Sequence, residues 1–150
     1  MGYYEAIEAA GVKIKEYKEF GSYQGDWFAI LEDNTVVHGG YGSCSGCDSF
    51  QGEFGWDDNI KEKQSNGKYY RNNYINEDDE LSEEQANIEN QAYNTKLCKF
   101  GQSYIVSPET LSEITERYKK KTIEEYAWED DREIYHWLLE KCKEYGVGEI

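Results

Sequence analysis

Two cysteines, Cys44 and Cys47, are the residues of this sequence best suited to chemistry. They stand two residues apart in the stretch Tyr-Gly-Ser-Cys-Ser-Gly-Cys-Asp, which spans residues 41–48. A stretch so rich in glycine and serine contributes little to a packed core, so another interaction must fix its shape. Two thiolates at this spacing can bind one tetrahedral Zn²⁺, because the turn between them aims both sulfurs at one point. We therefore predict a structural zinc ion in this loop.

A complete tetrahedral site needs two further ligands, and the sequence holds no second Cys-x-x-Cys pair. His38 lies just upstream, at the end of a predicted strand that leads into the loop. Cys98 lies on a predicted helix beside Leu97. We predict a zinc site made of Cys44, Cys47, Cys98 and His38. The ordinary alternative is a strand-end histidine at position 38 and a small apolar side chain at position 98.

Two other interpretations of the cysteine pair stay open. A thioredoxin-like redox pair favours a thiol at a helix N-terminus, where its pKa falls, but the many carboxylates of this chain would raise a thiol pKa. The alternative is a pair of free thiols. A catalytic metal would want an open position and a base, and the two histidines form no His-Glu-x-x-His motif. Phosphate-loop, dinucleotide and nucleophile-elbow motifs are also missing, so we do not predict an enzyme.

The charge of the chain restricts its partners. The sequence has 31 acidic and 16 basic residues and a net charge of −15. DNA, RNA and anionic membranes would be repelled, whereas a basic protein surface would be attracted. The longest apolar run is only residues 27–31, so neither a signal peptide nor a membrane span is predicted. We expect a cytoplasmic protein, a compartment in which disulfides are rare.

The hydrophobic pattern predicts a single α+β domain over residues 1–150. We expect a small antiparallel sheet from the N-terminal half, packed by two or three C-terminal helices. The predicted strands cover residues 12–20, 26–32, 35–38 and 68–75. The predicted short helices cover residues 3–10 and 48–54. Asp33-Asn34 is a typical hairpin turn, because both residue types tolerate positive φ.

Capping signals place the longer helices. Ser82 and Thr122 each open a capping box, and Ser107-Pro108 is typical of a helix start. We expect Gly101 to end the helix that begins after Ser82, and Gly146 to end the last one.

Several motifs carry a resemblance to small acidic proteins of phages and prophages. They are the stretches at residues 21–27 and 41–48, Phe-Gln-x-Glu-Phe-Gly at 50–55, and Leu-x-x-Phe-Gly-x-x-Tyr at 97–104. The resemblance covers residues 20–55 and 93–106. Phage proteins of this kind include inhibitors of bacterial defence, among them anti-CRISPR proteins of the type II-A class, some of which are stabilised by a metal. The resemblance implies a phage origin.

Residues 77–89 contain seven acids and no base, which is typical of a solvated loop that runs into a helix. The acids of residues 77–84 are candidate contacts for a basic partner. RNA-guided nucleases hold nucleic acid in positively charged channels, which an acidic inhibitor could occupy. We therefore expect a binding protein that inhibits a host defence protein in the bacterial cytoplasm. The alternatives are a metal-dependent or redox enzyme and a phage structural or accessory protein. Acids 129–131 are a further candidate contact. The principal predicted contacts are Asp78, Asp79, Glu80, Glu83, Glu84, Tyr69, Tyr70 and Tyr74.

Overall fold

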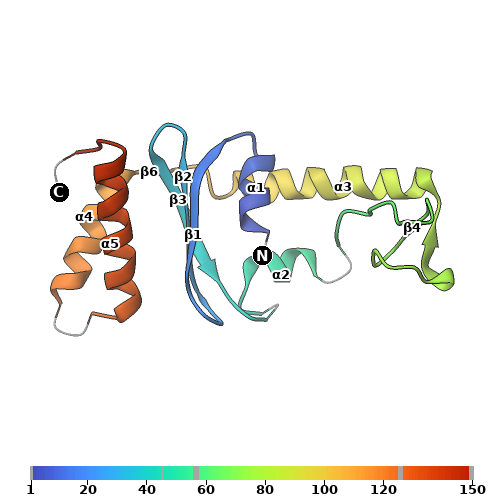
Figure 1. Cartoon of the computed structure of the whole chain (residues 1–150), viewed down its shortest axis with the longest axis horizontal. Coiled ribbons are helices and arrows are strands. Elements are labelled where there is room, and N and C mark those ends of the chain that lie inside the picture. The colour runs from blue at the N-terminus through green and yellow to red at the C-terminus, as the bar shows by residue number, and fades with distance from the viewer. Residues whose placement is uncertain (1, 45, 56–57, 125–126, 149–150) are drawn as a thin grey trace.

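A four-stranded antiparallel sheet lies between two layers of helices (Figure 1). The computed structural model describes residues 2–44, 46–55, 58–124 and 127–148. The strand order is β1-β2-β3-β6, and every neighbouring pair is antiparallel. The strands are β1 (Ile14–Gly21), β2 (Gly25–Leu31), β3 (Thr35–Tyr41) and β6 (Glu109–Thr110). The predicted α+β class is confirmed, as are the first three strands and the turn between β2 and β3.

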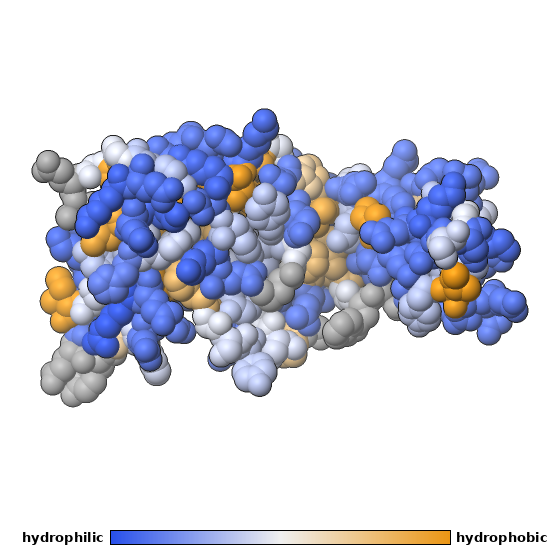
Figure 2. Space-filling model, viewed as in Figure 1, coloured by the Kyte–Doolittle hydropathy of each residue, from blue (hydrophilic) through white to orange (hydrophobic). Residues whose placement is uncertain are grey.

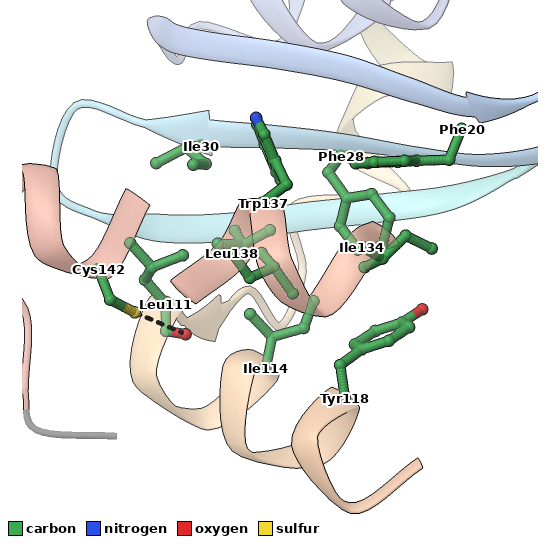
Figure 3. Packing of buried hydrophobic residues seen from close by; sticks show 11 residues of the cluster. Phe20, Phe28, Ile30, Leu111, Ile114, Tyr118, Ile134, Trp137, Leu138 and Cys142 are labelled. Carbon is green, nitrogen blue, oxygen red and sulfur yellow. Dashed lines mark hydrogen bonds between the residues drawn. The ribbon is translucent and has the colours of Figure 1, made fainter. Parts of the chain in front are cut away.

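Strand β2 is central because side chains on both of its faces are buried, as its unbroken apolar run predicts. Phe28 and Ile30 face one helical layer, made by α4 (Leu111–Ile123) and α5 (Glu129–Glu144). Figure 3 shows Leu111, Ile114 and Tyr118 of α4 and Ile134, Trp137 and Leu138 of α5 packing beneath these strands. Each of the two helices therefore buries one stripe of apolar side chains against the sheet.

The opposite face of the sheet is covered by α1 (Tyr3–Ala9) and the C-terminal part of α3 (Glu83–Gln102). Trp27 of β2 stacks on Tyr3 with 5.1 Å between ring centroids, and Tyr104 meets Trp27 edge-on at 5.1 Å. Gly101 does not end α3 as predicted. A Cβ at that position would lie 1.9 Å from the carbonyl oxygen of Ala6, so glycine permits the close crossing of α1 and α3. The glycine serves packing, and the helix ends one residue later, at Gln102.

The predicted starts of the last two helices are also wrong. Helix α4 begins at Leu111, with Thr110 as its N-cap, because residues 109–110 first pair with β3 as strand β6. The backbone N–H of Glu113 donates to Oγ1 of Thr110 at 3.1 Å. Thr122, predicted to open a capping box over residues 122–125, lies in the last turn of α4, and residue 125 lies outside the described residues. Helix α5 begins after Trp128. Because Glu109 and Thr110 pair with Val36 and Thr35 of β3, the N-cap of α4 is Thr110 and not Ser107.

A separate lobe extends along α3, away from the sheet (Figure 1). It contains β4 (Tyr69–Tyr70), a 3₁₀ turn η1 (Glu77–Asp79) and β5 (Glu80–Leu81), with β4 and β5 paired antiparallel. The strand predicted over residues 68–75 is cut short, because the chain turns at Asn73 with φ of 59°. No helix in the described part of the chain is long and apolar enough to cross a bilayer.

Candidate functional site

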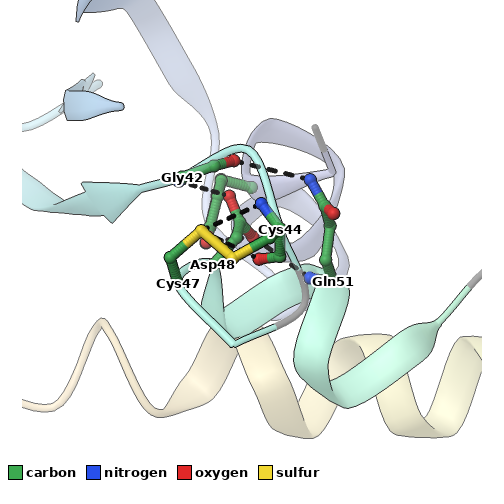
Figure 4. Close-up of a disulfide and its surroundings, with 6 residues drawn as sticks. Gly42, Cys44, Cys47, Asp48 and Gln51 are labelled. Carbon is green, nitrogen blue, oxygen red and sulfur yellow. Dashed lines mark hydrogen bonds between the residues drawn. A yellow bond between two sulfur atoms is a disulfide. The ribbon is translucent and has the colours of Figure 1, made fainter. Parts of the chain in front are cut away.

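The cysteine loop joins the end of β3 to the short helix α2 (Ser49–Phe54). Cys44 and Cys47 are exposed and joined by a disulfide, with their Cα atoms 5.2 Å apart (Figure 4). The backbone N–H of Cys44 donates to Sγ of Cys47 at 2.9 Å. The two sulfurs therefore converge, as their spacing predicts, but they are bonded to each other. This differs from the expectation of metal ligands or free thiols.

Asp48 fixes the shape of this loop. Its carboxylate is buried, and Oδ1 accepts from the phenol of Tyr3 at 2.8 Å and from the N–H of Gln51 at 3.1 Å. Oδ2 accepts from the N–H of Gly42 at 2.9 Å, a bond that is drawn in Figure 4. Burial raises the pKa of the Tyr3 phenol, with the Asp48 carboxylate adding to the rise, so this phenol stays a donor at neutral pH. The buried carboxylate thus fixes the shape of the loop between β3 and α2.

The other two predicted zinc ligands lie elsewhere. His38 stacks on Phe28, on the side of the sheet covered by α4 and α5. Its Nε2 lies 3.0 Å from Oε1 of Glu109, which also receives Arg117. Cys98 is half-buried on α3, which covers the opposite face. The four residues are therefore not assembled, and no group of three or more His, Cys, Asp or Glu in the described ranges could hold a metal ion. Zinc binding by a reduced Cys44–Cys47 pair stays a prediction.

The His38 contact has a structural role. Burial of the Glu109 carboxyl opposes its ionisation, but the hydrogen bond from His38 and the charge of Arg117 prevail and lower its pKa. The carboxylate therefore stays charged at neutral pH. It holds β6 against β3 and ties α4 to the edge of the sheet.

The second candidate region is the lobe of residues 58–81 together with the part of α3 that it covers. None of the three clusters of buried apolar side chains found in the described chain includes a residue of 58–81. Polar contacts hold the lobe together instead. The side chain of Asn90 binds both backbone groups of Lys61, accepting from its N–H at 2.6 Å and donating to its carbonyl at 3.0 Å. The side chain of Asn73 binds the two residues that flank Lys61. It accepts from the N–H of Glu62 at 2.8 Å and donates to the carbonyl of Ile60 at 2.6 Å.

Lys61 lies at the centre of this network. Its side chain is buried, and Nζ donates to Oδ1 of Asn59 and to the carbonyl of Arg71, both at 2.9 Å. At the base of the lobe, Lys96 of α3 donates to Oδ2 of Asp58 at 2.6 Å and lies over the ring of Phe54. A segment without an apolar core is thus given a defined shape and anchored to α3.

The predicted contact residues divide sharply in exposure. Asp78, Glu80, Glu83 and Glu84 are exposed, whereas Asp79 and Tyr69 are half-buried. Tyr70, a predicted binding anchor, offers no exposed ring, because it is buried at 3% exposure and its hydroxyl accepts from Asn66. Tyr74 is 59% exposed, and the sequence analysis missed two further exposed apolar residues nearby in the chain, Ile75 and Ile88. Ile88 is an apolar residue on the otherwise polar, exposed face of α3, and this pattern could have identified it as a candidate contact.

Some of the acids are already paired. Glu80 receives Lys68 at 3.0 Å and Glu89 receives Arg71 at 3.1 Å. Ser82 caps α3 by accepting from the N–H of Gln85 at 3.0 Å, as predicted, and Glu83 and Glu84 occupy the first turn. Negative side chains there stabilise the helix through its dipole. The surface therefore combines structural acids with exposed acids.

Comparisons with known proteins add no family: no family model, no curated protein and no solved structure matches this chain.

Proposed function

We propose that this protein is an acidic binding module, and that its lobe docks on a basic surface of a partner protein. The observation that supports this most is the lobe itself, an ordered projection with exposed acids and exposed Tyr74, Ile75 and Ile88 but no apolar core. Such a segment contributes little burial to the stability of the sheet and its helices. Acids would speed the encounter with a basic partner, and the apolar side chains would supply affinity.

The partner that we propose is a bacterial defence protein with a positively charged nucleic-acid channel, such as an RNA-guided nuclease. The resemblance to small acidic phage proteins supports this choice, as does the net charge of −15. Inhibition would follow from occupation of the channel, in the host cytoplasm, with no direct contact between this chain and nucleic acid.

The experiment measures binding to a purified type II-A nuclease, with and without guide RNA, together with target cleavage. A triple variant, Asp78→Lys, Glu83→Lys and Glu84→Lys, should weaken binding by more than about tenfold and reduce its dependence on salt. A matched variant reverses three exposed acids of α4 and α5, Glu116, Glu133 and Glu140. It makes the same change in net charge and should bind nearly as tightly. Equal losses in both variants, or no binding by the natural chain, would refute the proposal.

A second candidate function, thiol–disulfide exchange, is favoured by the exposed and bonded Cys44–Cys47 pair. A dithiol partner would reduce the bond through a mixed disulfide and would itself leave as a disulfide, so electrons balance. Equilibration of the protein with dithiothreitol buffers, followed by thiol alkylation, measures this exchange. Tight, stoichiometric zinc uptake by the reduced protein would instead support the structural metal.

A further inference from the structure

Strand β1 forms an open edge of the sheet. It pairs with β2 on one side, and no strand among the residues that the structure describes pairs with the other. Figure 1 looks onto this edge, with β1 in front and the helical layers to either side, and Figure 2 shows the same face as a mainly hydrophilic surface. From Glu16 to Gly21 the pairing with β2 is regular, and an irregularity separates Ile14 from Glu16. An unpaired edge of this length can add another strand.

The backbone groups of β1 alternate in direction. The carbonyl oxygen of Phe20 lies 1.8 Å from the position of a Cβ on Gly25, so Phe20 directs its carbonyl toward β2. In an antiparallel pair, alternate residues bond to the same neighbour. Tyr17 and Glu19 therefore direct their N–H and C=O groups outward.

We propose that β1 pairs with β1 of a second copy of this chain, antiparallel and around a twofold axis at Tyr17. In this register Lys18 lies opposite Glu16 of the second copy, and both side chains are on the face covered by α4 and α5. This Lys–Glu pair occurs twice by symmetry, and the two sheets become one. Opposite charges in such cross-strand positions stabilise a pair of strands.

Neighbouring registers lack this complementarity. Moving the axis to Glu16 places the two copies of Glu16 against each other, and moving it to Lys18 does the same for the lysines. Like charges directly opposite destabilise a strand pair. Of these three positions only Tyr17 has backbone groups that point outward, and an axis at Glu19 would again place two like charges opposite each other. The register centred on Tyr17 is therefore the one that brings Lys18 and Glu16 together.

The side chains that would meet are accessible. Lys18 is exposed. Glu16 accepts from Lys141 and from the phenol of Tyr145, both at 2.9 Å. Both bonds go to Oε1, and we assign its second oxygen to Lys18 of the second copy. Tyr17 meets Tyr4 of α1 edge-on, with ring centroids 5.5 Å apart, so α1 lies beside the axis.

A charged edge can also keep chains apart, because lysines on an edge strand discourage pairing. Each copy also carries a net charge of −15, which opposes association. At a salt concentration of about 0.15 M charges farther apart than about 8 Å are largely screened, whereas pairs in contact still attract. The proposal therefore concerns this ionic strength. It is independent of the proposed docking of the lobe, because β1 lies in the sheet.

Sedimentation equilibrium over a concentration series tests the association. We expect a monomer–dimer equilibrium for the natural chain. Lys18→Glu creates two like-charge contacts and should weaken dimerisation about tenfold or more. Lys63→Glu makes the same change in net charge on an exposed residue of the lobe and should leave it unchanged. A natural chain that stays monomeric at millimolar concentration, or equal dimerisation by all three proteins, would overturn the proposal.

Cross-linking tests the register. Residues paired at the axis have Cα atoms about 5.5 Å apart, within the range of a disulfide. Tyr17→Cys, made together with Cys98→Ser, should give a covalent dimer on oxidation, with mass spectrometry locating the bond at position 17. Glu19→Cys is the matched variant. Its copies are separated by four residues along the strand, about 13 Å, and should not be linked. Equal yields from the two variants, or a bond in neither, would contradict this register.

Discussion

The phenol of Tyr3 donates to Oδ1 of Asp48, 45 residues away in the chain, at 2.8 Å. This bond connects the first helix to the loop that holds Cys44 and Cys47. The loop owes its shape to a buried carboxylate that α1, α2 and the end of β3 share. Reduction or oxidation of Cys44 and Cys47 therefore does not remove the hydrogen bonds of Asp48 that hold the loop.

Asp48→Ala should strongly destabilise the protein. It removes the acceptor of the N–H groups of Gly42 and Gln51 and of the Tyr3 phenol. Each buried donor left without a partner costs about 1–3 kcal/mol, so we expect a loss of roughly 3 kcal/mol or more. Urea unfolding measures it. Tyr3→Phe removes only one of these three bonds, together with the bond that its hydroxyl accepts from the N–H of Phe50 at 3.2 Å, and keeps the ring against Trp27. It should therefore cost less than Asp48→Ala; equal losses would contradict the role given to Asp48.

Gly101→Ala should destabilise the protein, although alanine is the better helix former. The added methyl would meet the backbone of Ala6 and force α1 away from α3. Overpacking of this kind costs about 1–3 kcal/mol. Thermal or urea unfolding measures the change. Gly46→Ala meets no atom within 4 Å and is the control. A stabilised Gly101→Ala protein would show that the two helices do not cross here.

Asp33 should make a pH-dependent contribution to stability. Its carboxylate accepts from the hydroxyl of Thr35 at 2.6 Å and from the N–H of Thr35 at 3.0 Å, and these bonds lower its pKa from the ordinary value of an aspartate. A carboxylate whose pKa is lowered by folding stabilises the folded state at pH values above its unfolded-state pKa. That stabilisation is lost as the pH falls through its folded-state pKa.

Asp33→Asn keeps the acceptor but removes the charge. We expect the difference in unfolding free energy between the two proteins to be present at about pH 7 and to shrink below about pH 4. Urea unfolding at a series of pH values measures it. A difference that stays constant down to about pH 3 would show that the charge of Asp33 contributes nothing.

Asn90→Ala should loosen the lobe and leave the sheet intact. It removes both hydrogen bonds to the backbone of Lys61, in a segment without an apolar core. Hydrogen exchange measured by mass spectrometry should speed up across residues 58–75, while amides of β2 stay protected. Asn94→Ala, an exposed asparagine one turn further along α3, is the matched control. Faster exchange in β2 as well would mean that the lobe and the sheet open together.

Much of the local structure could be predicted from neighbouring residues. The unbroken apolar run of β2 predicted a strand buried on both faces, and Asp33-Asn34 predicted the turn, where Asn34 has φ of 67°. Ser82 caps α3 as expected, and Asp48 caps the short helix α2. These signals are reliable because a cap or a tight turn involves residues only two to three positions apart.

The candidate site was less accessible to this reasoning. The spacing of Cys44 and Cys47 predicted converging sulfurs, and the acidic run predicted an exposed surface at Asp78 and Glu83. The sequence did not show that Tyr70 is buried, because the contacts that cover it come from Asn66 and a paired strand.

The sequence by itself determined the strands of the meander, the helical stripes, the charge order of β1 and the acids of the lobe, because each depends on a short repeat or a local cap. Only the tertiary structure decided that α1 and α3 cover one face of the sheet, that His38 and Cys98 lie on opposite faces, and that β1 is an open edge. These relationships join residues far apart in the chain. They follow from how whole faces pack together, and a close crossing such as that of Gly101 and Ala6 leaves no local pattern by which to foresee it.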